Sequence, residues 1–399
     1  MQHRDVWITG VCLVSSIADG AEEHWIRLQN PIAPSVAELR ASGFLIHPLP
    51  ATDFSSQISN PLDLKRMGPM QALGIYAAGR ALTSAGLKSE DEILSSAAVI
   101  VSGAGGERDI AFDEAIFCEP TKFSDPATLN KRLSDRMRPS LFLSQLPNLL
   151  AGHISILFGV TGGSRTTIGE ELAGVNAIKL GHQLTADGTY DVALVGGAFN
   201  AARLDLLLLY GFGQYLWQHD YRPVWSRSER GGGCILGTMA AFLVLEAAEH
   251  AVGRGFAPWC HVCGVATRHT PRDNGDVAKA LDQIWEELEP LQRTGSLAII
   301  SGATGVSPAT EEELAGLSSL ATRLGGAQMR IPGSIFGHGM EASFPFNLGL
   351  AALALRNGRL YPPFLNEATS DMDTVSRLLV TSVGHFRGEA AALLTAVEL

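Results

Sequence analysis

The chain has 399 residues, and its 41 acidic side chains outnumber its 30 basic ones, which gives a formal net charge of −11 with the histidines neutral. Nucleic acids and anionic membranes are bound through clustered positive charge, and no run of Lys and Arg is longer than a pair such as Lys65-Arg66. The composition therefore excludes a general polyanion-binding protein.

Charged residues make up 18% of the chain and hydrophobic residues 46%, a low charge density that predicts a large buried interior, including a subunit interface. No apolar stretch approaches the roughly 18 residues of a membrane span. The polar start at Arg4-Asp5 is unlike a signal peptide, and the five scattered cysteines give no disulfide framework. We expect a cytoplasmic protein with reduced thiols and no membrane span.

Predicted strands and helices alternate along the chain. Runs rich in β-branched residues predict buried strands at 6–14, 97–106, 191–197 and 240–246, with helical periodicity at 70–86 and 170–184 between them. The second part is expected to contain strands at 259–266 and 297–302, helices at 276–288 and 311–324, a glycine-rich turn at 333–339, a helix at 346–356, and strands at 378–383 and 390–397. This pattern predicts an α/β protein with two halves, 1–246 and 247–399, in one body.

Five segments fall in a particular order and spacing. They are the opening Trp7-Ile-Thr-Gly-Val, the stretch 147–159, the stretch 222–246 that begins Arg222-Pro-Val-Trp-Ser, Gly337-His338 with 353–362, and the terminal Gly384-His-Phe-Arg-Gly388. Together they resemble the β-ketoacyl synthases, a family of the thiolase fold, over nearly the whole chain. The resemblance implies a layered α-β-α-β-α body, and we expect no cofactor.

The resemblance also implies where the chemistry of that family would lie. Active members use a Cys at a tight strand-to-helix turn, where the helix N-terminus lowers the thiol pKa and backbone N–H groups stabilise the oxyanion. Here the corresponding motif is Gly169-Glu-Glu-Leu-Ala-Gly174, which places Glu171 at the nucleophile position. No Cys between Cys118 and Cys234 can take its place.

Two histidines and a Lys complete the catalytic set of the family. The first His is expected at Ser301 or Gly302, within one residue, and the Lys position is Gly333, so only His338 matches. His338 can take part in chemistry or can be a remnant whose ring only forms hydrogen bonds in the core, and we favour the second interpretation. The chain is therefore expected to be inactive alone, although it resembles an acyltransferase family.

Three further positions correspond to the gating loops of the family, namely Cys234, His385 and Phe386. Cys234 stands where an aromatic residue often lies beside the nucleophile, and we expect it to be a small buried apolar side chain rather than a reactive thiol. Cys260 and Cys263 are an odd number of residues apart on a predicted strand and have no second ligand pair. We therefore expect no metal site.

The loss of the nucleophile determines the leading hypothesis. Acyl transfer from a thioester to Glu171 would give a high-energy mixed anhydride, and the carboxylate charge would repel both the oxyanion and a malonyl carboxylate. The family contains a Cys-lacking subunit, the chain-length factor, which forms a heterodimer with an active ketosynthase and shapes the acyl tunnel in type II polyketide systems. Many such subunits carry Gln, so Glu171 departs from the commonest pattern. The resemblance extends to bacterial aryl polyene systems, in which a Gln- or Glu-substituted partner also occurs and the products are linear, conjugated, lipid-linked chains.

The segment 107–117 falls where chain-length factors present tunnel-blocking side chains. If it is helical, Phe112 and Ile116 share one face and Phe117 is adjacent. The same spacing is equally typical of a simple core face.

Two other functions remain open. The chain could be a decarboxylase or thioesterase for malonyl carrier protein, with Glu171 as base and His338 as proton donor, or it could be a scaffold for other proteins. The acyl carrier protein implied by the resemblance is strongly acidic. Because this chain has a formal net charge of −11 and like charges repel, we expect the carrier to dock mainly on the Cys-containing partner.

Overall fold

Ten strands form one mixed sheet that has two five-stranded halves. The computed structural model of the protein describes residues 3–30, 34–38, 43–88, 91–103, 105–117, 126–136, 145–291, 295–365 and 374–397. The strand order in the first half is β5 (Gly163–Thr167), β4 (Ala98–Ser102), β6 (Val192–Phe199), β8 (Met239–Ala247) and β1 (Val6–Val14), and in the second half β9 (Cys260–Arg268), β13 (Glu389–Thr395), β12 (Arg377–Val383), β10 (Leu297–Ile300) and β11 (Gln328–Arg330). The halves join where Val6 to Ile8 pair with Cys260 to Val262.

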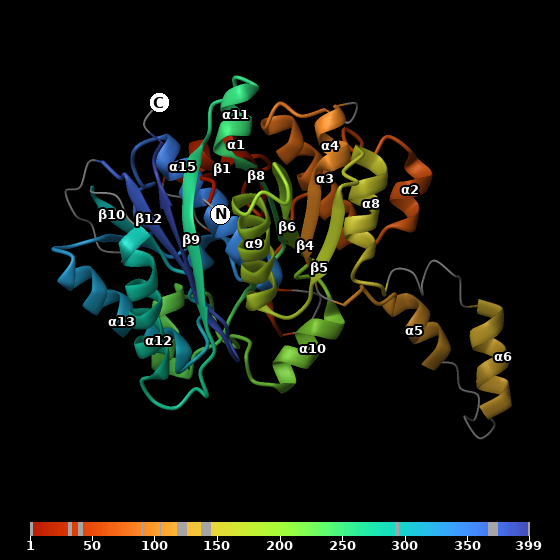
Figure 1. The fold of residues 1–399 in the computed structure, drawn as a ribbon. Coiled ribbons are helices and arrows are strands. Elements are labelled where there is room, and N and C mark those ends of the chain that lie inside the picture. Colours follow the sequence, from red (N-terminus) through yellow and green to blue (C-terminus); the bar gives the residue numbers. More distant parts are fainter. Residues whose placement is uncertain are drawn as a thin grey trace.

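Helices cover both faces of each half (Figure 1). The long helices are α3 (Pro69–Ser84) and α8 (Leu149–Phe158) outside the first half, α9 (Glu171–Ala186) and α15 (Ser343–Arg356) in the centre, and α12 (Asp276–Leu288) and α13 (Ala309–Arg323) outside the second half. Helix α15 is buried from Phe344 to Leu355, as expected for a helix between two sheets. The molecule therefore has the thiolase-like α-β-α-β-α fold predicted from the sequence.

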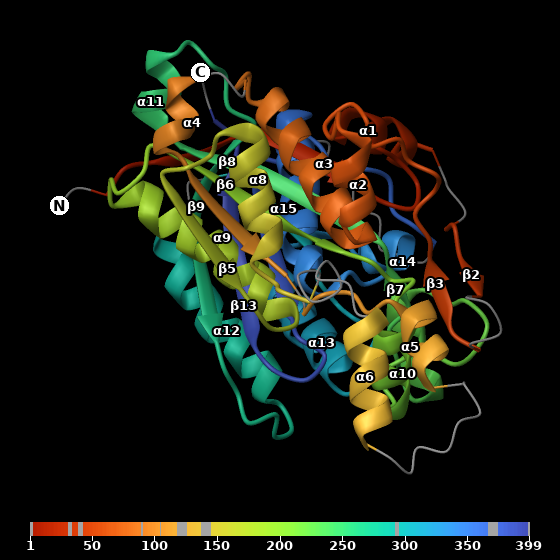
Figure 2. The ribbon, with the colours of Figure 1, turned by 90° about the vertical axis from the view of Figure 1, so that its right-hand side faces the viewer.

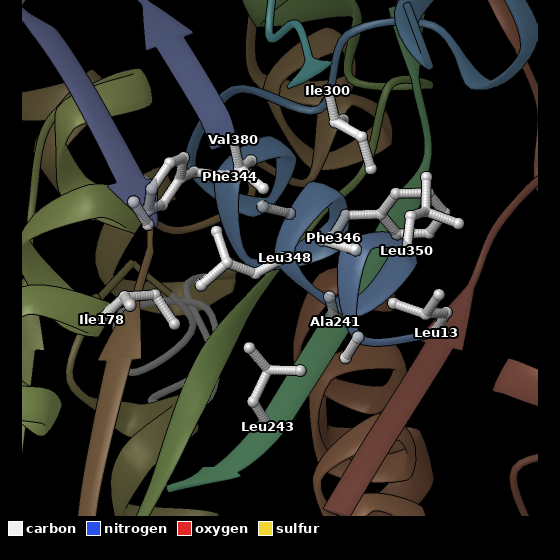
Figure 3. Packing of buried hydrophobic residues seen from close by; sticks show 14 of the residues in the cluster. Leu13, Ile178, Ala241, Leu243, Ile300, Phe344, Phe346, Leu348, Leu350 and Val380 are labelled. Atoms are coloured by element: carbon white, nitrogen blue, oxygen red, sulfur yellow. The ribbon is translucent and has the colours of Figure 1, made fainter. Parts of the chain in front are cut away.

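The central layer holds the main hydrophobic core. Figure 3 shows Phe344, Phe346 and Leu348 of α15 pointing among side chains from strands of both halves and from α9. Labelled neighbours in this cluster, each fully buried or nearly so, are Leu13, Ile178, Leu243, Ile300 and Val380. The two halves are thus fixed together by shared apolar packing and not by the short β1–β9 pairing alone.

Shorter elements complete the described structure. They are β2 (Ala37–Glu38), β3 (Leu45–His47) and β7 (Leu236–Gly237) in a small second sheet, and the helices α1 (Ala21–Leu28), α2 (Pro61–Arg66), α4 (Glu92–Ser96), α5 (Ile110–Phe117), α6 (Pro126–Arg136), α10 (Leu204–Phe212), α11 (Ala248–Gly253), α14 (Gly333–Phe336) and the 3-10 turn η4 (Met340–Ala342). Helices α5 and α6 extend away from the layered body (Figure 1), and Figure 2 shows the two helices beside each other. Within the described ranges, no helix is long and apolar enough to span a bilayer.

Most predicted elements are confirmed within a few residues, and α12 has the predicted bounds. The expectation of a simple turn at 333–339 is wrong in part, because Gly333–Phe336 forms one helical turn. Pro332 immediately precedes it with helical φ and ψ, and proline favours this position at a helix start. Strand β8 ends at Ala247, and the division into halves at 246/247 stays a prediction.

Candidate functional site

Glu171 begins helix α9 directly after the turn that leaves β5. Gly169 occupies this turn with a φ of 138°, a conformation that a side chain would strain. The Glu171 side chain is only 2% exposed, so the turn directs it into the protein. The tight strand-to-helix turn predicted from the sequence is therefore present, with a carboxylate at its inner side.

Two histidines and one backbone amide converge on a single oxygen of this carboxylate. His338 Nε2 lies 2.7 Å from Glu171 Oε1, and His385 Nδ1 lies 2.9 Å from the same atom. The His385 backbone N–H also donates to Oε1, over 3.2 Å. On its other side, the His338 ring faces the Ser343 hydroxyl, with Nδ1 and Oγ 3.3 Å apart. All three side chains of the cluster are buried.

The histidines keep Glu171 ionised. Burial alone would raise the pKa of this carboxyl, but the charge of His385 and hydrogen bonds from His338 and His385 hold it well below its usual value. Burial lowers the pKa of His385, but the nearby carboxylate overcomes this and raises it. Glu171 therefore forms a buried ion pair with His385, and the two imidazole rings stabilise its charge.

Three of the predicted catalytic positions lie around one very small cavity. Gly302, Gly333 and His338 line it, and its volume is about 10 Å³, which is room for at most about one water molecule. The other candidate for the first His position, Ser301, is buried and donates a 2.8 Å hydrogen bond to Glu313. The structure thus brings these positions together, but it leaves no space for a substrate between them.

The gating-loop positions also meet near Glu171. Cys234 is buried, and burial together with the Glu171 charge raises its thiol pKa to about 12, which fits a small apolar side chain better than a reactive one. The His385 ring is held edge-on between Tyr210 and Tyr215, with ring centroids 5.3 Å and 4.8 Å away. Phe386 points outward and is exposed.

The contact between His385 and Glu171 was not anticipated from the sequence. The two residues are 214 positions apart, and the resemblance assigned His385 only to a loop. A signal was nevertheless present, because an ionisable ring in a short loop between two buried strands needs a partner if it is itself buried. Glu341 was missed as well: it is buried near Glu171, and burial raises its carboxyl pKa to about 8.

A second cavity opens beside the loop that carries His385. It has a volume of about 410 Å³, and its lining includes Arg272, Glu312, His385, Phe386 and Arg387. His385 therefore stands between this cavity and Glu171. A larger cavity of about 820 Å³, lined mainly by α1, β1 and α3, contains none of the predicted site residues.

The tunnel positions lie on α5, so this part of the segment 107–117 is helical. Ile116 is 2% exposed, whereas Phe112 is half-buried. The Phe117 side chain lies outside the described part of the structure. In the described residues, no group of three or more His, Cys, Asp or Glu side chains could hold a metal ion. Cys260 is buried, and Cys263 Sγ lies 3.6 Å from both His261 Nδ1 and Thr395 Oγ1.

Comparisons with known proteins agree with this fold. Residues 3–251 match the family model described as the N-terminal domain of beta-ketoacyl synthase. Among curated proteins, a 3-oxoacyl-[acyl-carrier-protein] synthase 2 of Rhizobium meliloti is 26% identical over 93% of this chain and 90% of its own length. A putative polyketide beta-ketoacyl synthase 1 of Streptomyces halstedii is 25% identical over 74% of this chain and 71% of its length.

Solved structures show the same architecture. A beta-ketoacyl synthase from Burkholderia phymatum superposes with a TM-score of 0.80 at 16% identity and covers 99% of this chain and 100% of its own. The ishigamide ketosynthase/chain length factor gives a TM-score of 0.78 at 22% identity, and the match covers 99% of this chain and 100% of that chain. At these identities the likeness shows the fold alone.

Proposed function

The chain belongs to the β-ketoacyl synthase family, and we propose that it is a non-condensing subunit of the chain-length-factor type. In this role it pairs with a Cys-containing ketosynthase and forms part of the acyl tunnel during fatty-acid-like or polyketide chain synthesis. One observation carries the proposal: the side chain at the nucleophile position is a buried carboxylate, Glu171, bound by His338 and His385.

This carboxylate is unsuited to acyl transfer. Oε1 already accepts from two imidazoles and one backbone amide, so attack on a thioester would require breaking a charge-assisted network. The resulting anhydride would be less stable than the thioester. The cavity of about 10 Å³ beside His338 cannot admit an acyl or malonyl group, since ligand pockets measure roughly 300–1,000 Å³.

An exposed sheet edge supports the pairing with a partner. Strand β5 ends the ten-stranded sheet on one side, so one row of its backbone groups is free for another strand. Ile156, on the preceding helix α8, is 79% exposed, and Ile168, directly after β5, is 65% exposed. Isolated exposed apolar residues are common, but two large ones flanking an open strand edge favour a protein interface here.

The alternative, a decarboxylase or thioesterase that uses Glu171 and His338, gains no support from this geometry. A general base needs a pKa near the working pH and access to the substrate. Glu171 has a pKa held well below its usual value and is enclosed. The scaffold hypothesis is compatible with the same contacts and differs only in whether product formation depends on this chain.

The proposal is tested by producing this chain together with a Cys-containing homologue from the same source. We expect the two to co-purify in equal amounts and to condense acyl and malonyl groups on a carrier protein, whereas omission of this chain abolishes the product. Products are measured by mass spectrometry of the carrier-bound chains.

The homologue with its Cys replaced by Ser serves as the control and is expected to bind this chain without forming product. If the homologue condenses normally alone and this chain purifies without it, the proposed function is wrong. Binding without any effect on the product would instead favour the scaffold.

A further inference from the structure

The connection between β12 and β13 is a short loop, residues 384–388, that closes tightly on itself. Val383 pairs with Glu389 at its base, and the Gly384 N–H donates to Gly388 O over 2.9 Å. A Cβ on Gly384 would overlap Arg387 O and would lie 3.2 Å from Glu171 Oε2. The loop backbone is therefore pressed directly against the carboxylate of Glu171.

The inner side of the loop is attached to Glu171 twice. The His385 main-chain N–H and ring Nδ1 both donate to Glu171 Oε1. The ring of His338, which does not belong to the loop, contacts the same oxygen. A main-chain and a side-chain contact from one residue to one carboxylate fix both the position and the rotamer of that residue. Both contacts are charge-assisted, the stronger class of hydrogen bond.

The outer side of the loop is held through two arginines. Arg272 Nη2 donates to Gly384 O over 2.7 Å, and its Nε lies 3.0 Å from Glu389. Arg387 approaches Glu170 at 3.8 Å across an exposed surface, a type of ion pair that contributes little. The loop residues His385, Phe386 and Arg387 then form one wall of the cavity of about 410 Å³.

We propose that Glu171 is a positioning residue that latches the 384–388 loop, so that His385 closes the inner end of the 410 Å³ cavity. The residue at the nucleophile position thus fixes the conformation of a loop. A molecule that enters this cavity meets the His385 imidazole and cannot reach the carboxylate behind it. The inference concerns this chain alone and does not depend on the proposed function.

The latch should respond to pH because several ionisable groups face it. Glu171 faces His338, His385, Cys234, Tyr210 and Glu341. The pKa of Glu171 is lowered in the folded protein, so its contribution is lost as pH falls through that value.

His385 also faces charged groups, namely Glu170 and Arg272 besides Glu171. The pKa of His385 is raised in the folded protein. Its contribution to the stability of the latch is therefore complete below the pKa of about 6.5 that a His has in the unfolded chain, and it is lost as pH rises through the pKa of the folded protein. The latch is therefore strongest between the ordinary pKa values of the two groups, about 4.5 for the Glu carboxyl and about 6.5 for the His ring, and it weakens on either side of this range.

Hydrogen exchange at the amide of residue 385 reads the latch directly. We expect this amide to be protected in the unmodified chain and to exchange at least about tenfold faster in Glu171→Ala, because a hydrogen bond to a charged group is lost. In Glu171→Gln the carbonyl oxygen can still accept, so partial protection is expected. The matched control is Glu170→Gln, which removes the neighbouring charge and its exposed contact with Arg387 but leaves the Glu171 carboxylate and its hydrogen bonds in place.

A second measurement covers the case in which Glu171→Ala does not fold. The protection factor of amide 385 in the unmodified chain, corrected for intrinsic exchange, should pass through a plateau and decline at both acid and alkaline pH. Equal protection of amide 385 in Glu171→Gln, Glu171→Ala and the unmodified chain, or protection independent of pH, overturns the latch.

Discussion

At the scale of single residues, backbone atoms lie close to two of the positions where the resemblance places catalytic side chains, Gly302 and Gly333. A Cβ on Gly302 would overlap Thr381 O and would lie 3.1 Å from Ser382 Cα. A Cβ on Gly333 would lie 3.1 Å from Ala303 O. A side chain at Gly302 would therefore collide with the backbone of β12, whereas one at Gly333 would be tightly packed against Ala303 O.

The first prediction concerns Gly302→Ala. Because its Cβ would meet fixed backbone atoms, we expect the substitution to lower the free energy of unfolding by about 1–3 kcal/mol, as other overpacked cores do. The matched control is Gly152→Ala inside helix α8, where nothing lies within 4 Å of the new Cβ. That change should raise stability by roughly 0.5–1 kcal/mol. Urea unfolding measures the change in the free energy of unfolding for both variants. Equal effects of the two substitutions would contradict the close backbone contacts at Gly302.

At the scale of elements, helix α5 separates two interpretations that the sequence left equal. Ile116 is 2% exposed and therefore behaves as a core residue of this chain. Phe112 is half-buried one turn earlier, and α5 lies outside the layered body (Figure 1). Ile116 therefore fits the interpretation as a core residue. Part of the Phe112 side chain is exposed and can line a tunnel shared with a partner.

The second prediction follows from this difference. In the reconstituted pair, Phe112→Ala should lengthen the product, because a smaller side chain leaves more of the tunnel open, with little change in stability. Ile116→Ala should instead lower the free energy of unfolding by about 2–5 kcal/mol. Product mass and urea unfolding distinguish these outcomes. An unchanged product with Phe112→Ala would remove α5 from the tunnel.

The sequence predicts strongly patterned elements well and unpatterned ones poorly. Helix α12 is amphipathic, with buried residues such as Val277, Leu281 and Trp285 at helical spacing, and its predicted bounds are correct. Strand β5, Gly163–Thr167, was not predicted, because an edge strand with exposed and half-exposed side chains needs no apolar pattern. Likewise, spacing placed Glu171 at the turn, whereas its pairing with His385 depends on how two distant segments pack.

At the scale of the whole molecule, the two ends of the ten-stranded sheet differ. Strand β11 at one end has three residues, two of them buried, whereas β5 at the other end has none fully buried. Ile156 on α8 and Ile168 directly after β5 are exposed, so large apolar side chains occur near this edge as well as in the central core around α15. An edge of this kind is an aggregation risk unless another chain covers it.

The last prediction tests this margin as the partner interface. Ile156→Glu and Ile168→Glu should each weaken binding to the Cys-containing homologue by about tenfold or more if they lie at the centre of the interface, because a charge would be buried without a partner. The control is Val252→Glu on α11, which is 63% exposed but lies at the other side of the first half from β5 (Figure 1). Binding is measured by titration of the purified subunits, with thermal unfolding as a check on folding. If Val252→Glu weakens binding as much as the two isoleucine changes, the partner does not cover the β5 edge.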